Sequence, residues 1–246
     1  MNVLVLMAGN DDKFSEKGYP YPKNLIEVNS LPLVQRVLDS LKSLIGGVGK
    51  PIFLLRREEN RKFHTGMVIK LLLPEAHIID VGSLTGGAAC TALLAIDRIN
   101  SSEPLLIVNG DQILNIDMAG LIRSFQGRDL DGGIVVFEAY HPRWSYVKCD
   151  ENGYVVETAE KRPISKLATA GVFYFKKGED FVKAAMSMIK KDAHIDGKFY
   201  VCPCFNEMIL ERKRIGVEKI KREAYFSLAN PKGIEEYEQY LNMEVK

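Results

Sequence analysis

The sequence has few cysteines, almost no net charge and no long apolar run, and each shortage excludes a class of protein. Four cysteines in 246 residues are too few for a disulfide framework and fit a reducing compartment. Thirty-three basic and 32 acidic residues give a formal charge of +1, so we expect no nucleic acid partner. Apolar runs such as Asn2–Met7 are far shorter than the ~20 residues that span a bilayer, so we expect no membrane insertion. The chain opens without a secretory leader pattern, which predicts a cytoplasmic protein.

Short apolar runs alternate with helical patterns along the first half of the chain. The expected strands are Asn2–Met7, Pro51–Leu55, His77–Val81, Leu105–Asn109 and Gly132–Phe137. The expected helices are Leu31–Leu44, Glu58–Leu72, Gly87–Ile99 and Ile116–Phe125. Because the strand runs are apolar on both faces, the alternation predicts a parallel sheet covered by helices.

The pattern changes after Phe137. Asn152-Gly153 suits the positive φ angles of a tight turn and predicts a hairpin. The expected elements here are strands at Tyr146–Cys149, Tyr154–Glu157, Ala168–Phe175 and Ile215–Lys221, and helices at Glu179–Ile189, Tyr200–Arg212 and from near Pro231. No repeat or linker divides the chain, so we expect one α/β domain over residues 1–246 with an antiparallel addition.

Two segments near the N-terminus have the residue types of a phosphate site. Ala8-Gly9 opens the loop after the first strand, the position where α/β sheets commonly bind phosphates. Pro22 stiffens the backbone before Lys23, whose ammonium could pair with a phosphate. A plain turn and a solvated lysine are the simpler interpretations of these two segments.

Two further segments could contribute to the same site. Thr85-Gly86-Gly87-Ala88 opens a helix of small residues, which suits either close approach to a flat ligand or tight packing on the sheet. Asp111 follows an apolar strand and Gly110, so its carboxylate would lie at the strand's carboxyl end and could hold Mg²⁺. A turn-forming aspartate is the alternative there.

The second half offers candidates for an acceptor site. Glu160 could accept hydrogen bonds from sugar hydroxyls and Lys161 could neutralise a phosphate, although such a charged run is usually a solvated turn. Trp144 and Tyr146 could line a sugar pocket, with core packing as the equal alternative. Cys202-Pro-Cys204 lacks a second Cys/His pair at zinc spacing. The four histidines are scattered and fit structural or exposed positions.

In this order the segments resemble the sugar nucleotidyltransferases, the nucleotide-sugar pyrophosphorylases. That family has an A-G-x-G-x-R loop, a P-K lysine, a G-T-A-type turn, a G-D aspartate and an E-K-P motif. The matching segments here are Ala8-Gly9 with Lys13, Pro22-Lys23, Gly86-Gly87-Ala88, Gly110-Asp111 and Glu160–Pro163. They cover roughly residues 1–175, and the chain looks most like the branch found among bacterial capsule and lipopolysaccharide genes.

The resemblance implies a Rossmann-like three-layer α/β fold (GT-A-like) with a mixed central sheet and a small antiparallel β addition. It implies transfer of a nucleotidyl group from a nucleoside triphosphate to a sugar 1-phosphate or similar acceptor, with Mg²⁺ (or Mn²⁺) as cofactor. Residues 1–137 would be the nucleotide-binding half and residues 138–246 the acceptor-binding half. By the same resemblance, Lys23 and Asp111 are catalytic and Asp111 holds the metal. The other implied site residues are Ala8, Gly9, Lys13, Thr85, Gly86, Gly87 and Ala88 for nucleotide, and Trp144, Tyr146, Glu160, Lys161 and Gly171 for acceptor.

Three positions depart from the family pattern. Asp11 stands where the family loop has its second glycine, Lys13 where it has arginine, and Ser227 in the place of a second metal aspartate. Two alternatives follow: a catalytically weak homologue that binds nucleotides or nucleotide sugars, and a glycosyltransferase on a related fold. The latter would need a D-x-D-type motif, which Gly110-Asp111-Gln112 does not supply. A homo-oligomeric state is left open.

Overall fold

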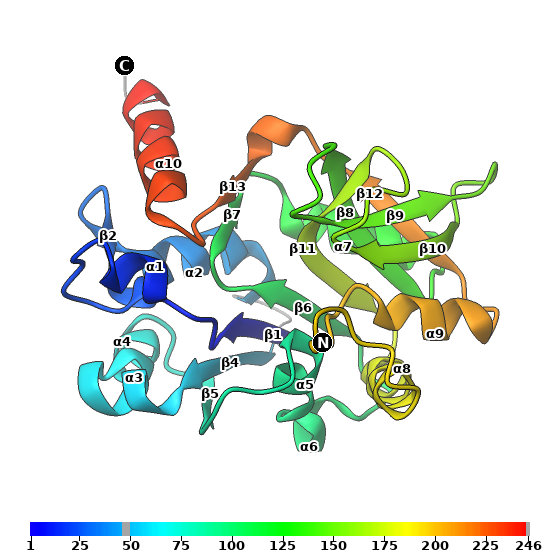
Figure 1. Ribbon diagram of the computed structural model, residues 1–246, viewed down its shortest axis with the longest axis horizontal. Helices are drawn as coiled ribbons and strands as arrows, with labels where there is room; N and C mark the ends of the chain where they lie inside the picture. Colours follow the sequence, from blue (N-terminus) through cyan, green and yellow to red (C-terminus); the bar gives the residue numbers. More distant parts are fainter. Residues whose placement is uncertain (46–49, 245–246) are drawn as a thin grey trace.

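The structure is a computed structural model that describes residues 1–45 and 50–244 (Figure 1). Its main sheet is built from β1 (Asn2–Met7), β4 (Lys50–Arg56), β5 (His77–Val81), β6 (Leu105–Asn109), β8 (Gly132–Glu138), β9 (Ser145–Cys149), β10 (Val155–Glu160), β11 (Leu167–Phe175) and β12 (Ile215–Lys219). These nine strands follow the order β10-β9-β11-β6-β1-β4-β5, while β8 pairs with β11 and β12. Strands from both halves of the chain therefore share one sheet.

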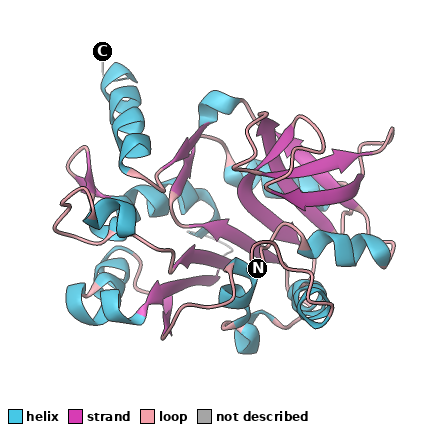
Figure 2. Ribbon diagram, in the orientation of Figure 1, coloured by secondary structure: helices cyan, strands magenta, loops and turns pink. Residues whose placement is uncertain are grey.

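Four adjacent strands, β6-β1-β4-β5, run parallel, as their apolar sequences predict. The fifth expected parallel strand is different. β8 lies away from β6 and pairs antiparallel with β11, because β11 takes the position beside β6. The sheet is therefore mixed, and Figure 2 shows the added strands gathered at one end of it.

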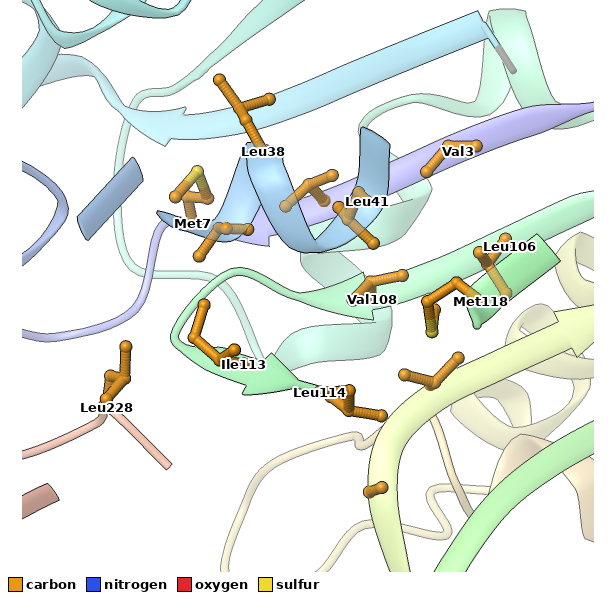
Figure 3. Packing of buried hydrophobic residues seen from close by; sticks show 14 of the residues in the cluster. Val3, Met7, Leu38, Leu41, Leu106, Val108, Ile113, Leu114, Met118 and Leu228 are labelled. Carbon is orange, nitrogen blue, oxygen red and sulfur yellow. The ribbon is translucent and has the colours of Figure 1, made fainter. Parts of the chain in front are cut away.

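Helices cover both faces of the sheet. Successive side chains of each strand point to opposite faces, so the strands contribute apolar residues to the core on both sides. Val3 and Val5 of β1 point into one buried cluster and Leu4 into the other. The first cluster is completed by α2 (Leu33–Ile45), α4 (Thr65–Leu72) and α7 (Met118–Gly127). The second is completed by α5 (Ala88–Leu93), α6 (Ile96–Ile99), α8 (Gly178–Lys190) and α9 (Cys204–Leu210). The result is three layers, and Figure 3 shows Leu38 and Leu41 of α2 lying over the sheet.

Three expected helices are shorter than their patterns predict. The stretch Glu58–Leu72 is divided into α3 (Arg57–Phe63) and α4 by His64, which takes the left-handed conformation with φ 56°. The stretch Gly87–Ile99 is divided into α5 and α6, where Leu94 and Ala95 make tighter i→i−3 bonds. The expected helix Tyr200–Arg212 is helical only within α9. In the first two cases local backbone geometry interrupts the helical pattern.

Short elements connect the sheet to the C-terminal segment. β7 (Gln112–Leu114) and β13 (Tyr225–Ser227) form an antiparallel pair, which the sequence did not indicate. The pair places Ser227 opposite Gln112 and lets the Leu228 amide donate to the Asp111 carbonyl at 2.8 Å. The C-terminal helix, α10 (Pro231–Glu244), begins at the expected proline and follows β13 (Figure 1). The remaining elements are α1 (Asp12–Ser15), η1 (Lys23–Leu25), β2 (Glu27–Val28), β3 (Leu31–Pro32) and η2 (Arg222–Ala224).

Candidate active site

A cavity of about 1010 Å³ lies where the parallel strands end. Each of β1, β4, β5 and β6 is followed by residues that line it, among them Gly9, Arg57, Gly82 and Asp111. Because these four strands are parallel and adjacent, their carboxyl ends open at the same edge of the sheet. The predicted juxtaposition of the first loop with Asp111 is therefore present in the structure.

Lys23 lies behind the cavity wall and faces Asp111. Its Nζ is 2.7 Å from Asp111 Oδ2, and the two side chains are 5% and 28% exposed. A Cβ added at Gly9 would lie 3.3 Å from the same Nζ, so the first loop runs directly over the ammonium. A buried lysine with a carboxylate partner excludes the interpretation of Lys23 as a solvated surface residue.

The acidic residues of the first loop have partners of their own. Asp11 forms a short ion pair with Arg56 at the end of β4. Asp12 lines the cavity, and its backbone amide donates to Asn10 Oδ1 at 2.8 Å. Lys13 is exposed on α1 and does not line the cavity, so the structure does not bring it together with the lining residues of the first loop.

The Gly86–Ala88 turn is held against the backbone of Phe199. Gly87 has φ 122°, and a Cβ there would lie 2.4 Å from the Phe199 carbonyl oxygen. The Phe199 amide donates to the Gly86 carbonyl at 2.7 Å, and the Ala89 amide donates to the Phe199 carbonyl at 3.0 Å. Gly87 is therefore required because the Phe199 backbone leaves no room for a Cβ at this position. Thr85, Gly87 and Ala88 nevertheless line the cavity, whereas Gly86 does not.

Three cysteines near this region lie where burial disfavours the thiolate. Burial raises the pKa of the Cys90 thiol, and it raises those of Cys202 and Cys204 further. The thiol form is therefore favoured at neutral pH, at the buried Cys202 and Cys204 as well as at the half-buried Cys90.

Glu160 and Trp144 line the part of the cavity that the second half of the chain provides. Glu160 ends β10, accepts a short hydrogen bond from Ser145 Oγ, and has its pKa raised by burial. The Trp144 ring makes edge contacts with Phe137 and Tyr225 at centroid distances of 5.3 and 5.4 Å. One carboxyl and one aromatic face therefore meet at this end of the cavity.

Two expected acceptor residues lie elsewhere. Tyr146 is fully buried, and its hydroxyl donates to the His141 carbonyl at 2.8 Å, so core packing is its role. Lys161 adopts a left-handed backbone with φ 54° and lies outside the cavity lining. Its Nζ is 3.0 Å from Asp196 Oδ2, a contact that raises its pKa.

Gly171 lines the cavity from a bulge in β11. Its φ is 64°, and a Cβ there would lie 2.4 Å from both Asn109 Nδ2 and Gln112 Oε1. Gln112 Nε2 also donates to the carbonyls of Ala170 and Gly171 at 2.6 and 3.1 Å. The glycine therefore leaves room for two amide side chains beside Asp111.

Comparison with known proteins was made on both sequence and fold. No family model matches the chain. It is 25% identical over 250 residues to the bifunctional protein GlmU of Methanocaldococcus jannaschii, covering 98% of this chain and 54% of that protein. It is 25% identical over 177 residues to the mannose-1-phosphate guanylyltransferase catalytic subunit beta of Drosophila melanogaster, covering 70% of this chain and 47% of that protein. The chain thus spans about half the length of these curated relatives.

Solved structures match more completely. A nucleoside-diphosphate-sugar pyrophosphorylase from Vibrio cholerae RC9 superimposes with a TM-score of 0.83 at 22% identity, covering 96% of this chain and 99% of that one. The inositol-1-phosphate CTP transferase of T. maritima superimposes with a TM-score of 0.73 at 14% identity, covering 94% and 90%. The chain has the nucleotidyltransferase fold. Relatives and structural neighbours include nucleotide-sugar pyrophosphorylases and sugar-phosphate nucleotidyltransferases.

Within this nucleotidyltransferase fold the cavity contains arginines that the sequence argument missed. Arg56 and Arg57 line it from the junction of β4 and α3, and the Arg57 guanidinium lies against Gly82. Arg143 lines it beside Trp144. The signal for the first two was available, since they directly follow a predicted parallel strand. No comparable pattern marks Arg143, which lies in an irregular turn.

The donors available for a divalent cation centre on Asp111. Within residues 1–45 and 50–244 no cluster of three or more His, Cys, Asp or Glu side chains has a metal-binding arrangement. Asp111 lines the cavity, and its second oxygen, Oδ1, has no hydrogen-bond partner among the described residues. A single carboxylate fits Mg²⁺, because that ion takes most of its other ligands from water and phosphate oxygens. Ser227 also lines the cavity but adds no charge.

No helix in the described part of the chain is both long and apolar enough to span a membrane.

Proposed function

We propose that this chain transfers a nucleotidyl group from a nucleoside triphosphate to a sugar 1-phosphate or similar phosphorylated acceptor, releasing pyrophosphate. The observation that carries the proposal is the Lys23–Asp111 pair at the carboxyl ends of adjacent parallel strands, bordering a cavity that Arg57 also lines. The similarity to pyrophosphorylases and to a guanylyltransferase supports it. Residues 1–137 and 138–246 would work as the nucleotide and acceptor halves of one domain.

The reaction exchanges one bond at phosphorus for another. An oxygen of the acceptor phosphate forms a bond to the α-phosphorus, the bond from that phosphorus to the bridging oxygen breaks, and pyrophosphate leaves with the electron pair. Such a transfer depends on positioning and on charge neutralisation. Lys23 would bind a non-bridging oxygen of the α-phosphate, and Arg57 would bind the pyrophosphate part.

The remaining cavity residues would orient the two substrates. Thr85, Gly87 and Ala88 would face the base, and Glu160 would accept a hydrogen bond from an acceptor hydroxyl. Trp144 would offer an aromatic face to the acceptor ring. Mg²⁺ or Mn²⁺ held by Asp111 would neutralise charge on the phosphate oxygens.

We place this activity in the cytoplasm, in the biosynthesis of surface polysaccharides. The support is the resemblance of the motifs to the branch found among capsule and lipopolysaccharide genes. A nucleotide-binding regulatory homologue is the second candidate, favoured by Ser227 at the place of the second metal aspartate.

The test is a pyrophosphate-release screen of the purified chain. All common nucleoside triphosphates are combined with a panel of sugar 1-phosphates and small phosphorylated alcohols, with Mg²⁺ present. Release that requires both substrates supports the transferase. Binding of a nucleotide without release in any combination would identify the regulatory homologue instead.

A further inference from the structure

We propose that Arg143, rather than Lys161, binds the phosphate of the acceptor, beside the Trp144 ring. This inference rests on the proposed transferase function and names a specificity-determining residue for it. The acceptor class that follows is a phosphate monoester whose phosphate is gripped by a guanidinium. The carbon part of the molecule would then face Trp144 and Glu160.

Lys161 is already ion-paired, and both of its partners line the cavity although it does not. Its ammonium is 3.0 Å from Asp196 Oδ2 and lies 5.5 Å from the centroid of the Tyr200 ring. The left-handed backbone at Lys161, with φ 54°, follows directly after Glu160 at the end of β10. Glu160 therefore faces the cavity while the next side chain lies outside its lining. To reach a phosphate in the cavity, Lys161 would have to exchange a carboxylate for it.

Arg143, in contrast to Lys161, lines the cavity. Its guanidinium carbon lies 4.3 Å from the Trp144 ring centroid, and the residue lines the cavity with Trp144, Ser145 and Glu160. No carboxylate forms an ion pair with it within residues 1–45 and 50–244. A planar guanidinium stacked on an indole keeps its edge donors available, and two of them match two oxygens of one phosphate.

Arg143 also lies toward the reacting end of the cavity. Trp144 contacts Tyr225 at 5.4 Å, and Tyr225 belongs to β13, which pairs with the strand that follows Asp111. Burial raises the pKa of the Tyr225 hydroxyl; the Asp111 carboxylate raises it as well, while the Arg143 guanidinium lowers it. Both charges therefore act on one hydroxyl. Arg143, Tyr225 and Asp111 line the same cavity, so a phosphate held by Arg143 would share that cavity with Asp111.

The chain's one tryptophan makes this directly measurable. Trp144 is the only tryptophan in the sequence, so tryptophan emission reports on the surroundings of this ring, which Arg143 contacts. We would titrate the full chain with inorganic phosphate and, separately, with glucose 1-phosphate, without nucleotide. The variants are Arg143→Gln, Arg143→Lys, Lys161→Gln and Arg162→Gln. Arg162 is a matched control because it is an exposed arginine paired with Glu157 outside the cavity lining.

The wild type should give a saturable change in emission with at least one probe. Arg143→Gln should raise Kd ~10-fold or more, because it removes a charge-assisted pair of hydrogen bonds. Arg143→Lys should lie between, since it keeps the charge and loses the bidentate geometry. Lys161→Gln and Arg162→Gln should stay within about twofold of the wild type.

Several outcomes would overturn the assignment of Arg143. They are a wild-type Kd in Arg143→Gln, a loss in Lys161→Gln as large as in Arg143→Gln, and no saturable change in the wild type with either probe. These measurements involve no turnover, so they stand apart from the pyrophosphate screen. A wild type that binds phosphate through Arg143 but releases no pyrophosphate would refute the proposed reaction alone. Where turnover is found, Arg143→Gln should raise the KM for acceptor and leave the KM for nucleotide near the wild-type value.

Discussion

The ammonium of Lys23 and the carboxylate of Asp111 lie 2.7 Å apart, although 88 positions separate the two residues in the chain. The contact joins the first residue of η1 to the turn between β6 and β7, beneath the first loop. Under the proposed function Lys23 binds phosphate with its remaining N–H donors, and Asp111 binds a divalent cation through Oδ1, which Lys23 does not contact. The pair holds both charges at the site before either ligand arrives.

Replacing Lys23 by alanine should remove most turnover. Loss of one preorganised cation at the transferring phosphate costs about 10²–10³ in rate. Lys13→Ala is the control, because Lys13 is exposed and outside the cavity lining, and it should retain turnover within a few-fold. Steady-state kinetics with the substrates found in the screen checks both variants, and similar losses in the two would contradict the role of Lys23.

Activity should require Mg²⁺ or Mn²⁺, and Asp111→Asn should abolish it. The neutral amide cannot match a carboxylate as a ligand for a hard cation, and Ser227 offers no second charge. The measurement is the dependence of kcat on free metal concentration. Undiminished turnover of the wild type in excess EDTA would exclude the metal role.

Asp11→Asn should leave the KM for nucleotide unchanged or lower it. Asp11 is paired with Arg56 at the end of β4, so its charge is already neutralised. The substitution removes a negative charge near the cavity and leaves Glu58, 3.9 Å away, as the ion-pair partner of Arg56, so that the guanidinium attracts a triphosphate more strongly. Kinetics at low and high salt would test this, since the gain should shrink as salt screens it. A large fall in kcat would mean that Asp11 itself serves the reaction.

Glu59→Gln should change the pH dependence of stability. Glu59 lies buried in α3, where Asn24 Nδ2 donates to both of its carboxyl oxygens at 2.9 and 3.1 Å and Thr65 Oγ1 donates at 2.9 Å. Burial outweighs these hydrogen bonds and raises its pKa above the ordinary value of 4.5. A raised folded-state pKa gives stability that is present below the unfolded pKa and is lost as pH rises through the folded value.

The glutamine variant has no such titration, so its stability relative to wild type should improve as pH rises above about 4.5. Urea unfolding of both proteins at pH 4.5, 6 and 7.5 measures the difference, and every other titrating group is common to the pair. A difference in unfolding free energy that stays constant across this range would show that Glu59 does not titrate there.

The sequence predicted the parts of this molecule that depend on local pattern. The four parallel strands, the hairpin around Gly153 and the helix from Pro231 follow from apolar runs, turn residues and a first-turn proline. The position of β8 did not follow, because pairing with β11 is decided by contacts distant in the chain. An apolar strand sequence does not show whether its neighbour in the sheet runs parallel or antiparallel to it.

The candidate site residues also divide into those that the sequence could place and those that it could not. Lys23 and Asp111 could be placed from their positions after strands and prolines. Lys161 could not, since a single left-handed residue turns its side chain toward Asp196. Tyr146 is buried in the core instead of lining the cavity, and core packing was the equal alternative that the sequence offered. Arg143 becomes a candidate only when its contact with Trp144 and the cavity is visible.

Gly87→Ala should destabilise the fold far more than an alanine at another positive-φ glycine. At Gly87, φ 122° and ψ 179° define a conformation that is almost restricted to glycine, and a new Cβ would lie 2.4 Å from the Phe199 carbonyl oxygen. Conformational strain and overpacking together should lower the unfolding free energy by roughly 3 kcal/mol. Gly153→Ala is the matched control, because Gly153 has φ 82° but nothing within 4 Å of a new Cβ. It should cost only about 1 kcal/mol. Urea unfolding of the two variants compares them, and equal losses would show that the Phe199 contact contributes nothing. Under the proposed function, Gly87→Ala should also raise the KM for nucleotide, since the turn that lines the cavity must shift away from Phe199.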